Sequence, residues 1–123
     1  MQSKTGLTAA FIGLALLTIN ADGANQPVTM RVSPAVSFAP ANLVIRARLE
    51  PYVNNRAMEV IAESADFYRS SVVPLEGKDA ARTTRIEFRG LPGGQYVVRT
   101  TLLGSDGRPR ASTAQELNII GIR

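Results

Sequence analysis

The sequence of 123 residues contains no cysteine, no histidine and no tryptophan. Without cysteine there can be no disulfide, no thiol nucleophile and no cysteine-ligated zinc. Without histidine, the Ser-His-Asp and Cys-His arrangements of nucleophilic catalysis are excluded, as are imidazole-ligated metals. We therefore expect a protein that is not an enzyme and that carries neither a metal nor another cofactor.

Carboxylates are the chemistry that remains. Glu59 and Glu63 have the spacing to approach one another only if their segment is helical. On a strand they share one exposed face, and a solvated polar face is the interpretation we favour over a catalytic pair.

The first residues have the pattern of a targeting segment. Lys4 precedes an apolar stretch over residues 7–19, and small residues follow at Ala21, Gly23 and Ala24. A basic start, a short apolar run and small residues are typical of a secretory signal peptide, whereas a spanning helix needs about 20 apolar residues. The pattern predicts a cleaved signal peptide over residues 1–24 and one exported domain over 25–123, periplasmic or extracellular and without stable membrane insertion.

Basic residues exceed acidic ones by 14 to 10, a formal net charge of +4. This excess favours anionic partners, either an acidic protein or a glycan. Nucleic acid is not expected, because the compartment is wrong and the basic residues are interspersed with acids.

Alternation of apolar and polar residues predicts most of the strands. Residues 43–50 place Leu43, Ile45, Ala47 and Leu49 on one face, which is the pattern of a half-buried strand. Similar alternation predicts strands at 84–88, 96–102 and 111–120. Residues 27–40 have extended character, and their prolines restrict them to an edge or break them into two pieces.

Residues 56–71 fit two patterns. At a period of two they form strands over 57–63 and 67–75 with a turn at 64–66, whereas helical spacing gives an equally regular apolar stripe. We favour two strands, because the edges of a sheet need to be covered.

A short motif joins two of the predicted strands. Leu91, Pro92, Gly94 and Tyr96 form a tight turn followed by a strand, with the tyrosine at its start. Such a tyrosine can hydrogen-bond the upstream backbone at the corner of a β-sandwich. With turns between short strands, the motif predicts an all-β, seven-stranded antiparallel sandwich.

The motif and the strand pattern over residues 28–120 resemble bacterial immunoglobulin-like or fibronectin type III-like domains. The chain departs from antibody-type domains, because it lacks their cysteine pair and core tryptophan. The resemblance implies a binding, spacer or assembly role, and no catalytic residues are carried over.

Arginines mark a candidate interaction face. Arg46 and Arg48 share the exposed side of one predicted strand, and Arg85, Glu87 and Arg89 that of another. If these strands are neighbours, the face either forms cross-strand ion pairs or docks an acidic partner.

The function predicted from these features is a non-catalytic module for protein–protein interaction or assembly in the cell envelope. β-Augmentation is a candidate mode of binding, with free edges expected at residues 28–37 and 115–120. The alternative is a carbohydrate-binding accessory module, in which Tyr52, Phe67 or Tyr68 would line one exposed face.

Overall fold

The computed structural model describes residues 26–121, which are all-β apart from turns, loops and one short 3-10 helix, η4 (Gly77–Asp79). The strands are β1 (Val28–Ser33), β2 (Val36–Phe38), β3 (Ala41–Leu49), β4 (Ala57–Glu63), β5 (Tyr68–Pro74), β6 (Thr83–Leu91), β7 (Gly94–Leu103) and β8 (Pro109–Ile120). The predicted signal peptide, residues 1–24, lies outside the described residues. Within residues 26–121, no helix has the length and apolar character needed to span a membrane.

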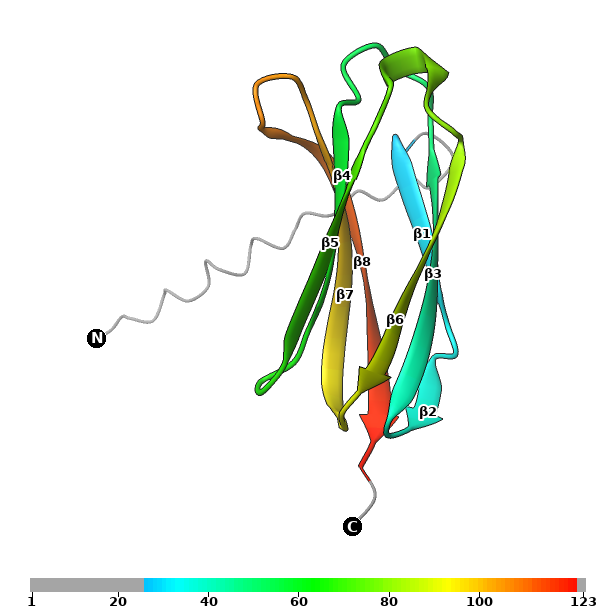
Figure 1. Ribbon diagram of the computed structural model, residues 1–123, viewed down its shortest axis with the longest axis vertical. Helices are drawn as coiled ribbons and strands as arrows, with labels where there is room; N and C mark the ends of the chain where they lie inside the picture. Colours follow the sequence, from blue (N-terminus) through cyan, green and yellow to red (C-terminus); the bar gives the residue numbers. More distant parts are fainter. Residues whose placement is uncertain (1–25, 122–123) are drawn as a thin grey trace, which may run out of the picture.

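The strands form two sheets that pack against each other (Figure 1). One has the order β1-β3-β6 and the other the order β2-β8-β7-β4-β5. Neighbours are antiparallel except β2 and β8, which are parallel. The expectation of seven antiparallel strands is corrected here, because residues 26–121 contain eight strands and one parallel pair.

The additional strand arises in the proline-containing segment at residues 27–40. Pro34 separates β1 from β2, and each half joins a different sheet. Proline has no N–H group for a ladder, so it favours such a break. Both predicted alternatives are confirmed, because the segment is broken into two strands and each of them is at the edge of its sheet.

The segment with two possible patterns consists of strands. β4 and β5 are antiparallel neighbours joined by a turn, so the two-strand prediction is confirmed and the helical alternative is wrong. Met58, Val60 and Ala62 are fully buried, whereas Glu59 and Glu63 lie on the other face of the sheet. Burial of that apolar face overrides the helical spacing.

One core lies between the two sheets. The apolar residues of β3 (Leu43, Ile45, Ala47 and Leu49) are at most 2% exposed, as their alternation predicts. β7 contributes Tyr96, Val98 and Leu102 from the opposite sheet. Burial of apolar area at about 25 cal/mol per Å² is the main favourable term for such a fold.

A glutamine connects the sheets on the side where β1 lies near β8. The side-chain oxygen of Gln115 accepts from the Val32 N–H at 3.2 Å, and its Nε2 donates to the Val32 carbonyl at 3.3 Å. The side-chain amide thus occupies the place of a peptide group from a neighbouring strand. Gln115 lies on the inward face of β8 together with Leu117 and Ile119.

We expect Gln115→Leu to lower the free energy of unfolding by about 1–3 kcal/mol, because the backbone groups of buried Val32 would lose both partners. Urea denaturation measures the change. Gln95→Leu, at an exposed position of β7, is the matched control. Equal stabilities of the two variants would show that the Gln115 hydrogen bonds contribute nothing.

Candidate functional site

The arginines predicted to share a surface do so. β3 and β6 are antiparallel neighbours, with Arg46 directly opposite Arg85. The structure adds Arg31 of β1, which lies opposite Arg46 from the other side. We call the outer surface of this sheet the arginine face, defined by five exposed residues: Arg31, Arg46, Arg48, Arg85 and Arg89.

Charge on the arginine face is strongly one-sided. The outward residues of its three strands include five arginines and one glutamate, a formal charge of +4. Side chains directly opposite on neighbouring strands have Cβ atoms about 5 Å apart. The row Arg31–Arg46–Arg85 therefore sets three like charges side by side, an arrangement that destabilises a sheet. The cross-strand ion pairs offered as one interpretation of this face are not found among residues 26–121, because the ion pairs there join residues of a single strand or loop.

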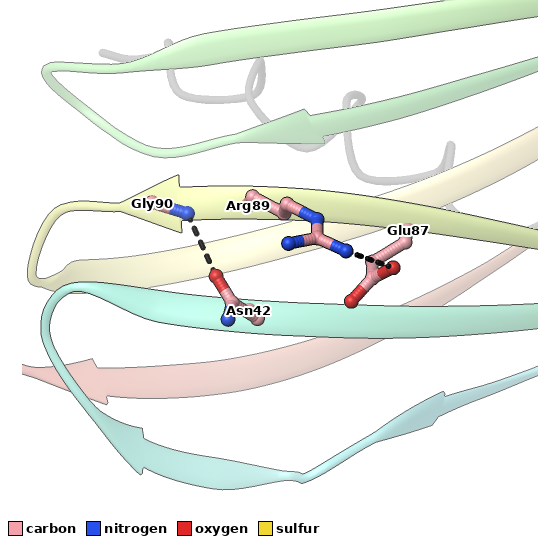
Figure 2. Close-up of polar contacts among 4 residues, drawn as sticks. All are labelled: Asn42, Glu87, Arg89 and Gly90. Carbon is pink, nitrogen blue, oxygen red and sulfur yellow. Dashed lines mark hydrogen bonds and ion pairs between the residues drawn. The ribbon is translucent and has the colours of Figure 1, made fainter.

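A single acid belongs to this face. The Glu87 carboxylate accepts from the Arg89 guanidinium at 3.2 Å, which is the one ion pair on the arginine face among residues 26–121 (Figure 2). Beside it, the Asn42 side-chain oxygen accepts from the Gly90 N–H at 3.0 Å. Glu87 lies opposite Val44 rather than an arginine. No acid is therefore directly opposite an arginine of the row, and Glu87 lies two residues along β6 from Arg85.

A shallow depression of about 240 Å³ lies over this charged region. Its lining includes the side chains of two threonines and three arginines (Thr29, Thr83, Arg31, Arg46 and Arg48). Guanidinium and hydroxyl donors are suited to carboxylates and other oxyanions, and arginine can bind a carboxylate through two parallel hydrogen bonds. The chemistry of this surface therefore favours an anionic ligand.

The corner motif joins β6 to β7 at the lower end of the fold in Figure 1. The Tyr96 hydroxyl donates to the Pro92 carbonyl at 2.7 Å. Tyr96 is 1% exposed, and Leu91 is fully buried. The hydrogen bond is the one that the sequence predicts for a tyrosine at this place. It gives the corner a structural role.

Two further contacts of the corner were not visible in the sequence. A Cβ added to Gly93 would lie 2.7 Å from the Cα of Gly121, so only glycine allows the two backbones to approach this closely. The ring of Phe67 packs edge-on against that of Tyr96, with centroids 6.4 Å apart.

Burial raises the pKa of Tyr96, while hydrogen bonding with Ser64 and the charge of Arg69 lower it by less.

The aromatic platform of the carbohydrate-binding alternative does not form. Tyr52 precedes β4, whereas Tyr68 lies opposite Glu63 at the other end of that strand. The backbone of β4, about 20 Å long, lies between these two positions. Phe67 is half-buried against Tyr96. The three side chains therefore offer no common face on which a sugar could stack.

The free edges predicted at residues 28–37 and 115–120 are confirmed in part, because β1 and β2 are the end strands of their sheets. β8 pairs with β7 along most of its length. The free edge predicted at residues 115–120 is wrong for residues 118–120, which also pair with β2, whereas residues 115–117 pair with β7 only. β1 is an edge strand, but Gln115 occupies the backbone groups of Val32. The strands at the other side, β5 and β6, each pair with one neighbour only.

No protein-family model matches the sequence, and no curated protein is significantly similar to it. Solved structures show similar folds. A family 76 glycoside hydrolase from a bovine Bacteroides thetaiotaomicron strain matches 77% of this chain at 16% identity, with a TM-score of 0.55. The match covers 20% of that hydrolase, so the chain spans about one fifth of its length.

A second similar structure is a superoxide reductase (neelaredoxin) from Ignicoccus hospitalis. It matches 76% of this chain and 80% of its own, at 12% identity and a TM-score of 0.55. Likeness at such low identity concerns the two-sheet fold alone. The activities of these two proteins differ, and neither is transferred to this chain.

Proposed function

We propose that the protein is an exported, non-catalytic, immunoglobulin-like β-sandwich module that binds an acidic protein in the cell envelope or outside the cell. The arginine face is its docking surface. Export is supported by the basic and apolar pattern of residues 1–24. The immunoglobulin-like assignment is supported by the Tyr96 corner and by the two packed sheets.

The row Arg31–Arg46–Arg85 is the observation that carries this proposal. Three like charges in a row lower the stability of the sheet, so folding alone gives no reason for them. Departures from the rules of stable folding are expected at functional sites. A partner that placed carboxylates among these guanidinium groups would remove the repulsion and gain charge-assisted hydrogen bonds.

Arg46→Glu is expected to raise the stability of the free domain and to abolish partner binding. The substitution converts two repulsive cross-strand pairs into two attractive ones, which adds about 1 kcal/mol at low salt. In roughly 1 M salt the gain should nearly vanish, because the Debye length is then about 3 Å. Urea denaturation at both ionic strengths tests this, and a loss of stability at low salt would contradict it.

Crosslinking in envelope fractions of the producing cells tests the proposed function directly. The mature protein, tagged at its N-terminus, is compared with a variant in which Arg46, Arg48 and Arg85 are replaced by alanine. A second triple variant, with Arg56, Arg99 and Arg108 replaced by alanine, removes as many exposed arginines away from the arginine face.

We expect one acidic protein to be enriched by the wild type and the second variant, and lost with the first. Equal recovery by both variants would refute the docking role of the arginine face. Recovery of glycan without protein would instead favour the carbohydrate-binding alternative.

A further inference from the structure

The two sheets have unequal widths on the side formed by β5 and β6. β6 ends the three-stranded sheet, while the other sheet continues past β4 to β5. Arg69 of β5 donates through Nη1 to the Arg89 carbonyl of β6 at 3.1 Å, so both edges lie on the same side of the fold (Figure 1). Among the described residues, no strand lies beyond β6 to cover β5.

Burial shows that the inner face of β5 is incompletely covered. The inward residues of β4 are fully buried. The corresponding residues of β5 (Arg69, Ser71 and Val73) are only half-buried. Phe67 and Ile86 are also half-buried apolar residues at the margin of the core. An additional strand beside β6 would cover this margin.

The register identifies which backbone groups of β6 face the open side. The Leu49 N–H donates to the Arg82 carbonyl at 2.7 Å, so this pair is a hydrogen-bonded one. In an antiparallel ladder such pairs alternate along the strand. The N–H and C=O groups of Thr83, Arg85 and Glu87 therefore point away from β3.

Arg89 belongs to the same alternating set and marks where the open edge stops. Its carbonyl accepts from Arg69 across the gap between the sheets. The stretch available for pairing is therefore Thr83 to Glu87, which offers three N–H and three C=O groups. A strand of about seven residues is sufficient to cover it.

Charge restricts what can lie next to this edge. Arg85 is the last arginine of the row that begins at Arg31. A residue of an added strand that lies opposite Arg85 is therefore next to the last of three like charges. An acidic residue there would have its Cβ atom about 5 Å from the Cβ atom of Arg85, so its carboxylate could reach the guanidinium group. Apolar residues at the alternate positions would face Val73 and Ile86.

The shape of the fold selects one strand rather than a second copy of the chain. Antiparallel pairing of β6 with β6 of another copy would place both five-stranded sheets on the same side of the joined sheet. Because β5 extends beyond β6, each copy's β5 would then meet the other's β4. A single extended segment lies over β5 without this collision.

We propose that the β6 edge binds one extended segment of a partner protein, antiparallel to β6, with a carboxylate opposite Arg85 and apolar residues at the alternate positions. This inference rests on the proposed function and specifies the partner's binding segment. Strand addition of this kind draws affinity from main-chain hydrogen bonds and specificity from alternate side chains.

A synthetic peptide with the capped sequence Val-Thr-Val-Glu-Val-Thr-Val is the probe. Its central glutamate is set opposite Arg85, with threonines opposite Thr83 and Glu87. We expect binding to slow hydrogen exchange of the Arg85 and Glu87 amides at least about tenfold, as measured by NMR on the folded domain. Unchanged exchange of these amides at a saturating peptide concentration would overturn the proposal.

Two N-methylated peptides provide the matched control. Methyl groups on the glutamate nitrogen and the two threonine nitrogens block the N–H groups that face β6, whereas methyl groups on three of the four valines, at peptide positions 3, 5 and 7, leave those groups free. Methylation of the glutamate and threonine nitrogens should weaken binding at least about tenfold more than methylation of the valine nitrogens. Equal affinities would show that the peptide does not bind by strand addition.

A charge exchange tests the side-chain contact. Arg85→Glu should lose affinity for the glutamate peptide and gain affinity for the same peptide with lysine in its place. If the variant shows no such reversal, the carboxylate does not lie opposite Arg85. If these peptide tests fail while the envelope partner still requires the arginine face, strand addition is wrong and the proposed function stands.

Discussion

Asn55→Ala is expected to lower the free energy of unfolding by about 2–4 kcal/mol, the largest effect we predict for a single polar side chain. Asn55 is fully buried. Its Nδ2 donates to the Glu50 carbonyl at 3.0 Å, and its Oδ1 accepts from the Arg110 guanidinium. Removal of the amide leaves the Glu50 carbonyl and the Arg110 guanidinium without Asn55 as a partner. The effect is large because a hydrogen bond to a charged group contributes more than a neutral one.

The backbone of Asn55 adds two further connections. Its N–H donates to the Tyr52 carbonyl at 3.1 Å, and its carbonyl accepts from the Gly77 N–H at 3.0 Å. The Arg110 guanidinium also lies 4.1 Å from the centroid of the Tyr52 ring. Asn55 thus joins the β3–β4 loop to the β5–β6 loop and to the start of β8.

Urea denaturation of Asn55→Ala beside Asn54→Ala measures the effect. Asn54 is half-buried, and its side-chain oxygen accepts one hydrogen bond, from the Ser105 N–H at 2.8 Å. Its replacement should cost about 1 kcal/mol or less. Equal losses for the two variants would refute the role assigned to Asn55.

Tyr96→Phe is expected to cost about 1–2 kcal/mol at neutral pH, because it removes the hydrogen bond to the Pro92 carbonyl and leaves the ring in place. Tyr68→Phe, at an exposed ring of β5, is the matched control and should be near neutral. If both substitutions have the same effect in urea denaturation, the corner hydrogen bond does not stabilise the fold.

The same variant should differ from the wild type in alkaline solution. Burial raises the pKa of Tyr96 in the folded protein above the value of about 10 that a tyrosine has when unfolded. Its contribution to stability is therefore constant below about pH 10 and is lost as the pH rises through the folded-state pKa.

Tyr96→Phe lacks this titration, so the stability difference between it and the wild type should shrink as the pH rises past about 10. Unfolding free energies over an alkaline pH series, with Tyr68→Phe treated in parallel, measure this difference. A difference that stays constant or grows with pH would contradict the effect of burial on Tyr96.

Local patterns in the sequence predict much of this fold. The alternation in β3 and the prolines around β2 have physical causes that act over a few residues. The outward positions of Arg46, Arg48, Arg85 and Arg89 follow from the same alternation. The choice between strand and helix at residues 57–63 depends on whether the edges of a sheet are covered, and that is a property of the whole fold.

Long-range pairing accounts for what the sequence analysis missed. Arg31 is an outward residue in its own segment, but its place in the row depends on β1 pairing with β3. Asn55 suits a turn, and its burial arises from two loops and β8 meeting around it. The role of Gln115 could have been predicted, because it is a polar residue at an inward position of an alternating strand.

The parallel pairing of β2 with β8 has a consequence for resistance to stretching. A pull between Gln26 and Gly121 first loads the pairing of β1 with β3. It then acts on opposite ends of the parallel strands β2 and β8 and slides one along the other. The hydrogen bonds from Asn118 N–H to the Ala35 carbonyl and from Ala39 N–H to the Ile120 carbonyl, 3.2 and 2.8 Å long, then carry the load together. Three residues of β2 thereby give the fold a mechanical clamp, since bonds loaded in shear must break together rather than one after another.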